Sequence, residues 1–149
     1  MSIEQSPERI REIAMALDDA LDAKNTEEIV SFFADDCEIK LLGVKLSGKD
    51  GVQKWLDWLF KHLSDIKFIP VTIMVEDNVF FEEFIARGTL QDGTILESKQ
   101  AEVLIYENYK IKSLRLYFDR LDFADAIARN PISKRVVGLL IKRSLEGLR

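Results

Sequence analysis

The chain has 149 residues, of which 47% are hydrophobic and 32% are charged, as expected of a single globular domain that can bury a core. Its net charge of −5 argues against nucleic acid as the main partner, because neutralising phosphates requires a basic surface. A single cysteine excludes an intramolecular disulfide, no signal-peptide pattern is visible, and no apolar stretch approaches the roughly 20 residues that span a bilayer, so we expect a cytoplasmic protein.

Three helices are predicted in the first half of the chain. Ser6-Pro7-Glu8 has the residue types of a helix start, and apolar residues follow it at helical spacing. Asn25-Thr26 ends this helix and caps a shorter one. Residues 37–46 have an extended pattern, and residues 47–51 form a predicted turn. A third amphipathic helix then runs to about Leu63.

From residue 67 the apolar period changes to two, which is typical of half-buried strands. Turn-forming residues predict strands over 67–75, 79–90, 94–106 and 110–118, followed by helices over 119–128 and 132–147. Helices followed by consecutive antiparallel strands predict an α+β fold. A sheet of this length tends to curl around its helices, so the hollow between helices and sheet is the expected ligand site.

Three segments carry a family resemblance: "ALDAKNTEEIVSFFADD" at 20–36, "GKDGVQKWLDWLF" at 48–60 and "KIKSLRLYFDRLDFADAI" at 110–127. Together they resemble the NTF2-like superfamily, in particular its SnoaL-like and limonene epoxide hydrolase branch, over about residues 7–128. The resemblance implies a cone-shaped domain over 1–128, in which a curved antiparallel sheet wraps around the N-terminal helices. It also implies a homodimer packed through the outer sheet face, and a pocket for small apolar molecules. Residues 129–149 form a separate C-terminal helical extension.

The catalytic residues of the limonene epoxide hydrolases do not carry over. Aligned without gaps, the position of their water-activating aspartate is Leu116, and Glu83 stands where they have an arginine. Ile85 replaces the arginine's aspartate partner, while Ile39 and Leu41 replace the tyrosine and asparagine that hold the attacking water. Ordinary epoxide hydrolysis is therefore not expected, because it needs both a base and an acid at the ring.

Catalysis by Asp119 and the ketosteroid isomerase mechanism also find little support in the sequence. Asp119 lies on the opposite strand face from Leu114, Leu116 and Phe118 and stands where a helix begins, so a helix cap is favoured over catalysis. The ketosteroid isomerase mechanism needs a tyrosine on the first helix, and residues 7–23 contain none.

The remaining polar candidates lie on two neighbouring strands. Glu83 is the candidate acid or base, assisted by Arg87 or Gln100, since an apolar surrounding raises the pKa of a carboxyl. The alternative is that Glu83 and Arg87 only satisfy each other's charge. Ser98, Gln100 and Glu102 are placed on the inner face by the family register, although a bulge could shift that register. The residues expected to line the pocket are Ile39, Leu41, Leu59, Leu63, Ile85, Ser98, Leu114, Leu116 and Phe118.

No other residue pattern indicates a metal or cofactor site. His62 is the single histidine and is expected on a helix surface. Cys37 has acidic sequence neighbours and is expected to be a buried residue rather than a nucleophile. The segment "GKDG" lacks the spacing of a phosphate-binding loop. We therefore expect neither a metal nor a cofactor.

The C-terminal segment differs in charge from the rest of the chain. Residues 129–149 hold six basic residues and one acid, whereas residues 1–38 hold eleven acids and three bases. A basic amphipathic helix can lie on an anionic membrane, but docking on its own domain or on a second subunit is favoured. The leading hypothesis is a homodimer that binds a small hydrophobic molecule. The alternatives are an acid–base isomerase, cyclase or hydrolase using Glu83, and a protein- or membrane-interaction module using the C-terminal helix.

Overall fold

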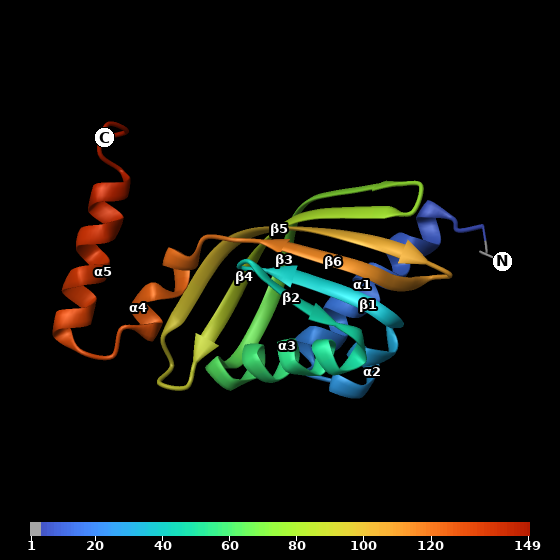
Figure 1. Cartoon of the computed structure of the whole chain (residues 1–149), viewed down its shortest axis with the longest axis horizontal. Helices are drawn as coiled ribbons and strands as arrows, with labels where there is room; N and C mark the ends of the chain where they lie inside the picture. Colours follow the sequence, from blue (N-terminus) through green and yellow to red (C-terminus); the bar gives the residue numbers. More distant parts are fainter. Residues whose placement is uncertain (1–3) are drawn as a thin grey trace.

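The computed structural model describes residues 4–149, apart from the side chain of residue 125. Helices cover one face of a curved sheet, and the C-terminal helix lies at the opposite end of the molecule from the N-terminus (Figure 1). The helical elements are α1 (Pro7–Asp22), α2 (Thr26–Ser31), α3 (Gly48–His62), a 3-10 turn (Arg120–Phe123), α4 (Ala124–Ile127) and α5 (Pro131–Ser144). No helix among these residues is long and apolar enough to cross a membrane.

The sheet has six strands in the order β2-β1-β6-β5-β4-β3. Neighbouring strands are antiparallel except β1 and β6, which are parallel. This arrangement confirms the α+β prediction and adds a parallel pair that local sequence patterns did not indicate. The strands are β1 (Phe33–Leu41), β2 (Val44–Ser47), β3 (Leu63–Glu76), β4 (Val79–Leu90), β5 (Ile95–Glu107) and β6 (Lys110–Tyr117).

Two predicted boundaries change in the region between the second and third helices. The extended segment begins at Phe33 and is split by a turn at Leu42 and Gly43, both of which have positive φ. The predicted turn over residues 47–51 is wrong, because α3 already begins at Gly48. Short apolar stretches give weak periodicity, so the sequence did not separate β1 from β2.

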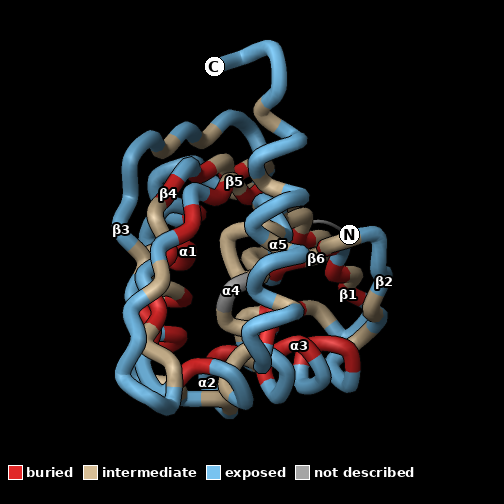
Figure 2. The backbone as a smooth tube through the Cα atoms, turned by 90° about the vertical axis from the view of Figure 1, so that its left-hand side faces the viewer, coloured by how far each residue is buried: buried red, intermediate tan, exposed pale blue. Residues whose placement is uncertain are grey.

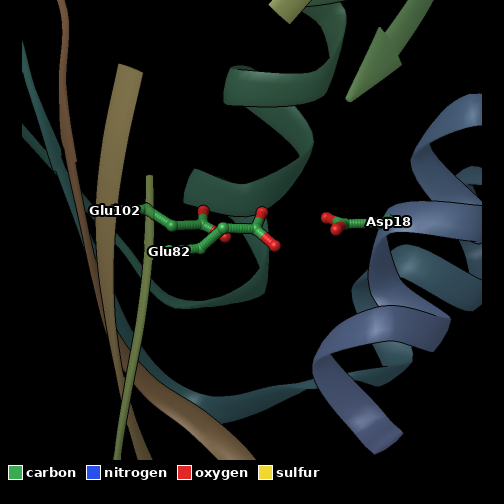
Figure 3. Close-up of side chains that lie close together, drawn as sticks. All are labelled: Asp18, Glu82 and Glu102. Atoms are coloured by element: carbon green, nitrogen blue, oxygen red, sulfur yellow. The ribbon is translucent and has the colours of Figure 1, made fainter. Parts of the chain in front are cut away.

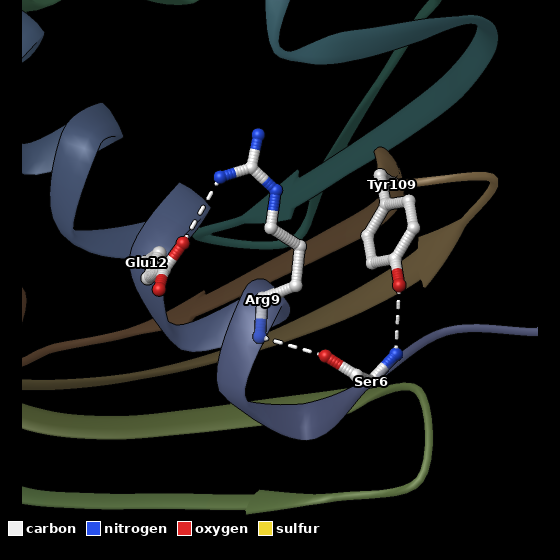
Figure 4. Close-up of polar contacts among 4 residues, drawn as sticks. All are labelled: Ser6, Arg9, Glu12 and Tyr109. Atoms are coloured by element: carbon white, nitrogen blue, oxygen red, sulfur yellow. Dashed lines mark hydrogen bonds and ion pairs between the residues drawn. The ribbon is translucent and has the colours of Figure 1, made fainter.

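The N-terminal segment is attached to the turn between β5 and β6, and this attachment positions α1. The Ser6 side chain accepts a hydrogen bond from the backbone N–H of Arg9 (3.0 Å), while the Ser6 N–H donates to the Tyr109 hydroxyl (2.8 Å; Figure 4). The Gln5 amide donates to the Tyr106 carbonyl (3.0 Å) and accepts from the Tyr109 N–H (2.9 Å). The start of α1 is therefore tied to the end of β5.

The core lies between the helices and the inner face of the sheet. Its buried side chains come from α1, α2, α3 and the four strands β1, β4, β5 and β6, so the helices and the sheet form one cluster. By contrast, α5 contains no buried residue and is exposed along most of its length (Figure 2). The largest side chains of the core are Tyr106, Phe33, Phe80, Ile10, Leu17, Ile29, Ile39, Leu56, Leu104, Ile111 and Leu114.

Candidate functional site

Three carboxyl groups from three elements converge between α1 and the inner face of the sheet. Asp18 comes from α1, Glu82 from β4 and Glu102 from β5, and a carboxyl oxygen of each lies within 4.8 Å of the others. Figure 3 shows the side chains pointing toward one another. We refer to these three residues as the carboxyl cluster.

Strand pairing and helix periodicity explain this convergence. Glu82 and Glu102 are direct cross-strand partners, so their side chains lie on the same face at neighbouring positions. Asp18 stands four residues after Ala14, on the buried side of α1, and one residue after the buried Leu17. The attachment of the N-terminal segment to the β5–β6 turn holds α1 so that Asp18 faces the two strands.

The cluster is largely closed to solvent. Glu82 is 0% exposed and Glu102 is 9% exposed, whereas Asp18 is partly exposed and leaves one side of the cluster accessible. If all three carboxyls were ionised, neither oxygen of Glu82 would receive a hydrogen bond from the described residues. A proton on Asp18 changes this, because the resulting O–H group donates to Glu82.

Burial raises the pKa of each member of the carboxyl cluster, and neighbouring negative charges raise it further for Asp18 and Glu102. Burial, followed by the negative charge of Glu82, raises the pKa of Asp18 from 3.8 to about 8. Burial raises the pKa of Glu82 from 4.5 to about 7, partly offset by the hydrogen bond from Asp18. The pKa of Glu102 lies well above 4.5 because of burial and the charges of the other two. The cluster therefore holds protons at neutral pH.

Other polar groups of β5 lie on the same inner face as Glu102. Tyr106 is 0% exposed, and its hydroxyl has no hydrogen-bond partner among the described residues. Burial and the charges of Glu102 and Asp18 raise the Tyr106 pKa, so the hydroxyl stays protonated and lies within electrostatic reach of the cluster. Gln100 is 8% exposed beside Glu102, and the Ser98 hydroxyl donates to the Asp122 carboxylate (2.7 Å).

The predicted inward orientation of Glu83 and Arg87 is wrong by one residue. The exposed Glu83 carboxylate accepts a hydrogen bond from the Thr72 hydroxyl (3.0 Å), and Arg87 forms an ion pair with Glu97 (2.5 Å). These side chains therefore lie on the outer face, and the proposed Glu83–Arg87 pair does not form. Ile85 shares their strand parity and is also directed away from the inner face.

The other residues predicted for the pocket fall into two groups. Ile39, Leu41, Leu63, Ser98 and Leu114 are buried. Leu59, Leu116 and Phe118 are partly buried against the core. Leu116, the position onto which the family resemblance maps the hydrolase aspartate, is the direct cross-strand partner of Glu102.

Sequence reasoning placed Glu102 and Gln100 inward but missed Asp18, Glu82 and Tyr106 as site residues. The sequence pattern that could have placed Glu82 inward is its position between Phe80 and Phe84, which lie on the same face of the strand. The signal was weak because Phe81 and Ile85 make the opposite parity equally apolar. Asp18 had only helical spacing to indicate it, and convergence with the strands depends on tertiary structure.

Three other residues considered in the sequence analysis have surroundings that suit a structural role rather than catalysis. Asp119 caps the 3-10 turn, since its side chain accepts from the Leu121 N–H (2.9 Å). Cys37 is buried, and burial raises the pKa of its thiol, which opposes a nucleophilic role. His62 is exposed and makes an edge contact with the Trp58 ring, with ring centroids 6.4 Å apart.

Two surface hollows on the described part of the chain lie away from the carboxyl cluster. One, of about 330 Å³, is lined by Phe33, Lys49 and Lys112 among others, and it does not include the carboxyl cluster. The spacing of the three carboxyl oxygens also resembles that of the ligands around a hard cation. Such binding requires deprotonated carboxyls, so a cation would have to displace the protons that the cluster holds at neutral pH.

Comparison with known proteins identifies the family. A family model described as "SnoaL-like domain" matches residues 14–113. The chain belongs to the SnoaL-like domain family. The matched segment includes all three members of the carboxyl cluster. No curated protein matches this SnoaL-like chain.

Solved structures show that the fold is NTF2-like. An NTF2-like protein of unknown function from Burkholderia pseudomallei has 16% identity and a TM-score of 0.74, covering 81% of this chain and 98% of its own. A protein from Catenulispora acidiphila with a ketosteroid isomerase-like fold, in complex with trimethylamine, has 16% identity and a TM-score of 0.70, covering 77% and 91%. The epoxide hydrolase/cyclase-like enzyme SalBIII has 14% identity and a TM-score of 0.69, covering 77% and 94%. At these identities the likeness shows the fold alone.

Proposed function

We propose that this SnoaL-like domain binds a small, mostly apolar molecule beside the carboxyl cluster and transfers protons to or from it. The observation that carries the proposal is the convergence of Asp18, Glu82 and Glu102 inside a mostly apolar core. In the described part of the chain, no basic residue shifts their pKa values. The acid–base hypothesis is thereby transferred from Glu83 to its neighbour Glu82.

The pKa values of the cluster suit general acid–base catalysis. Proton transfer is most effective when the pKa of the catalytic group lies near the working pH. Glu82, at about 7, and Asp18, at about 8, both meet this condition. Asp18 is partly exposed and can exchange protons with solvent, while the buried Glu82 is placed to pass them to a ligand. Two carboxyls this close share a proton rather than ionise independently.

The surroundings of the cluster favour an apolar ligand body. Phe80 and Phe84 flank Glu82 on the inner face of β4, while Leu104 flanks Glu102 on β5 and Leu116 lies beside it on β6. Among proteins of similar fold, one is described in complex with trimethylamine and another as an epoxide hydrolase/cyclase-like enzyme. Both descriptions support small-molecule binding by this fold, and the second supports enzymatic activity.

The test combines ligand discovery with isotope exchange. Small molecules extracted from the denatured protein are identified by mass spectrometry. They are then incubated with fresh protein in D₂O, and deuterium incorporation at carbon is measured. We expect wild-type protein to catalyse the incorporation and Glu82→Gln to lose it, because an amide cannot accept or release the proton. Glu83→Gln is the matched control, since Glu83 is exposed on the outer face. Equal exchange by wild type and Glu82→Gln would disprove proton transfer by Glu82.

The C-terminal helix supports a second candidate function, protein interaction. α5 contains no buried residue, and Ile132, Val136, Leu139 and Leu140 are 50% or more exposed. Val71, Met74 and Tyr117 are further exposed apolar side chains on the sheet and are available for a homodimer contact. Removal of residues 131–149 tests the role of α5. Light scattering then shows whether a dimer depends on the helix, and vesicle sedimentation shows whether membrane binding does.

A further inference from the structure

None of the described residues supplies the carboxyl cluster with a counter-charge. The ion pairs recorded in the described part of the chain all lie elsewhere, and no lysine, arginine or histidine contributes to the pKa of any member. The neighbouring charges that do act on Asp18 are those of the acids Glu82, Asp22 and Asp19. Protons are thus the only compensation that the described residues show for this excess of negative charge.

The cluster also has unused capacity to accept hydrogen bonds. While the three carboxyls are ionised, neither oxygen of Glu82 accepts a hydrogen bond from the described residues, and a proton on Asp18 satisfies only one of them. The hydroxyl of Tyr106, whose pKa responds to the charges of Glu102 and Asp18, has no partner in this part of the chain either. Glu82 and Tyr106 are both 0% exposed, so bulk water does not supply their partners. Buried polar groups without hydrogen-bond partners lower the stability of the fold. A ligand that satisfies these acceptors must bring hydrogen-bond donors.

We propose that the polar end of the ligand is a protonated nitrogen, so that the carboxyl cluster is a binding site for small apolar ammonium compounds. This inference rests on the proposed function, because it specifies the ligand of the same site. An ammonium group supplies both the positive charge and the N–H donors that the protein does not. Its hydrocarbon body suits the apolar neighbours Phe80, Phe84 and Leu104.

Other ligand chemistries satisfy fewer of these conditions. A carboxylate or phosphate would be repelled by the cluster and would add acceptors where donors are needed. A neutral carbonyl compound accepts hydrogen bonds only, so it requires protonated carboxyls. An inorganic divalent cation provides charge but makes no use of the apolar surroundings.

The sign of the pH dependence distinguishes an ammonium ligand from a neutral acceptor. The titratable groups that face the ligand are Asp18 from α1, Glu82 from β4, and Glu102 and Tyr106 from β5. An ammonium ion prefers ionised carboxylates, so its affinity should increase from pH 6 to pH 8. A carbonyl compound prefers the protonated acids, so its affinity should decrease over the same range.

The experiment uses three probes with one hydrocarbon body: cyclohexylmethylamine, cyclohexylmethanol and cyclohexanecarboxylate. Methylamine and butylamine are included to allow for a smaller site. Binding to the full chain is measured by isothermal titration calorimetry between pH 6 and pH 8. At pH 8 we expect an amine to bind at least about tenfold more tightly than the alcohol, and the carboxylate not to bind. Glu82→Gln should weaken amine binding at least about tenfold and weaken alcohol binding much less, because only the amine loses an opposite charge.

Matched variants keep the test decisive. Glu83→Gln should bind the amines as wild type does, because its side chain is on the outer face. Asp18→Asn provides a second variant if Glu82→Gln does not fold. The inference is overturned if the alcohol binds as tightly as the amines, if none of the amines binds, or if Mn²⁺ binds in a Glu82-dependent manner while the amines do not. If deuterium exchange still requires Glu82 in these cases, the proposed function stands and only the ammonium specificity fails.

Discussion

Neutralising Glu82 should stabilise the folded protein at alkaline pH. The perturbation is Glu82→Gln, which keeps the shape of the side chain and removes its ability to ionise. Glu82 is 0% exposed and has no basic partner over the residues that the structure describes, so its charged form is costly in the folded state. In the unfolded chain the same carboxylate is hydrated at little cost. Removing the charge therefore benefits the folded state more than the unfolded state.

The expected magnitude follows from the shifted pKa of Glu82. Burial raises this pKa from 4.5 to about 7, and one pKa unit corresponds to about 1.4 kcal/mol. The folded state thus binds the proton more strongly than the unfolded state does. The stabilisation that comes from this bound proton is fully present below pH 4.5 and is lost as the pH rises through about 7. Glu82→Gln should remove this loss and raise the free energy of unfolding by about 3 kcal/mol at pH 8.

Urea unfolding at pH 4.5 and pH 8, followed by the fluorescence of the buried Trp55, measures the effect. The gain should be close to zero at pH 4.5, where the wild-type carboxyl is already protonated in the fold. Glu83→Gln should change stability by less than about 0.5 kcal/mol at both values, since that side chain is exposed. A Glu82→Gln variant that is equally stabilised at both pH values, or destabilised at pH 8, would refute the reasoning.

Three further changes probe the fold. Gly88→Ala should destabilise by about 1–3 kcal/mol in thermal unfolding, because a Cβ there would lie 2.7 Å from the Leu63 Cδ2 atom; an unchanged melting temperature would contradict this. Asp119→Ala should cost about 1 kcal/mol through the lost cap on the Leu121 N–H and leave deuterium exchange unchanged, whereas loss of exchange would point to catalysis. Removal of residues 131–149 should leave the melting temperature of the domain almost unchanged, since α5 buries no residue; a drop of more than about 5 °C would show that the helix docks.

The sequence predicted the architecture because each element has a strong local signal. The amphipathic first and third helices and the change of period at residue 67 led to the α+β fold that the structure shows. The parallel pairing of β1 with β6 brings together residues such as Ile39 and Leu114, which are far apart in the chain. No local pattern encodes that contact. The irregular pairing between Pro70 and Thr72 likewise shifts the parity of β3 within a single strand.

The site was predicted less well because its two strand faces are both apolar. Phe80 and Phe84 flank Glu82 on one face of β4, while Phe81 and Ile85 flank Glu83 on the other. Periodicity alone therefore could not decide which glutamate faces inward. The family register chose Glu83, and packing against α1 determines the opposite result. Gln100, Glu102 and Ser98 were placed correctly because the register held for β5.

The cost of the carboxyl cluster is itself an argument for function. Each member has a raised pKa, so ionising any of them consumes folding free energy, and no ion pair between described residues offsets that cost. The fold accepts an aliphatic side chain in the same row, as Leu116 beside Glu102 shows. A purely structural role would be met better by such residues. Asp18 leaves the cluster partly open to solvent, so protons can enter and leave, which a structural core does not need. Strongly shifted carboxyls at an accessible edge of the core are what proton transfer requires.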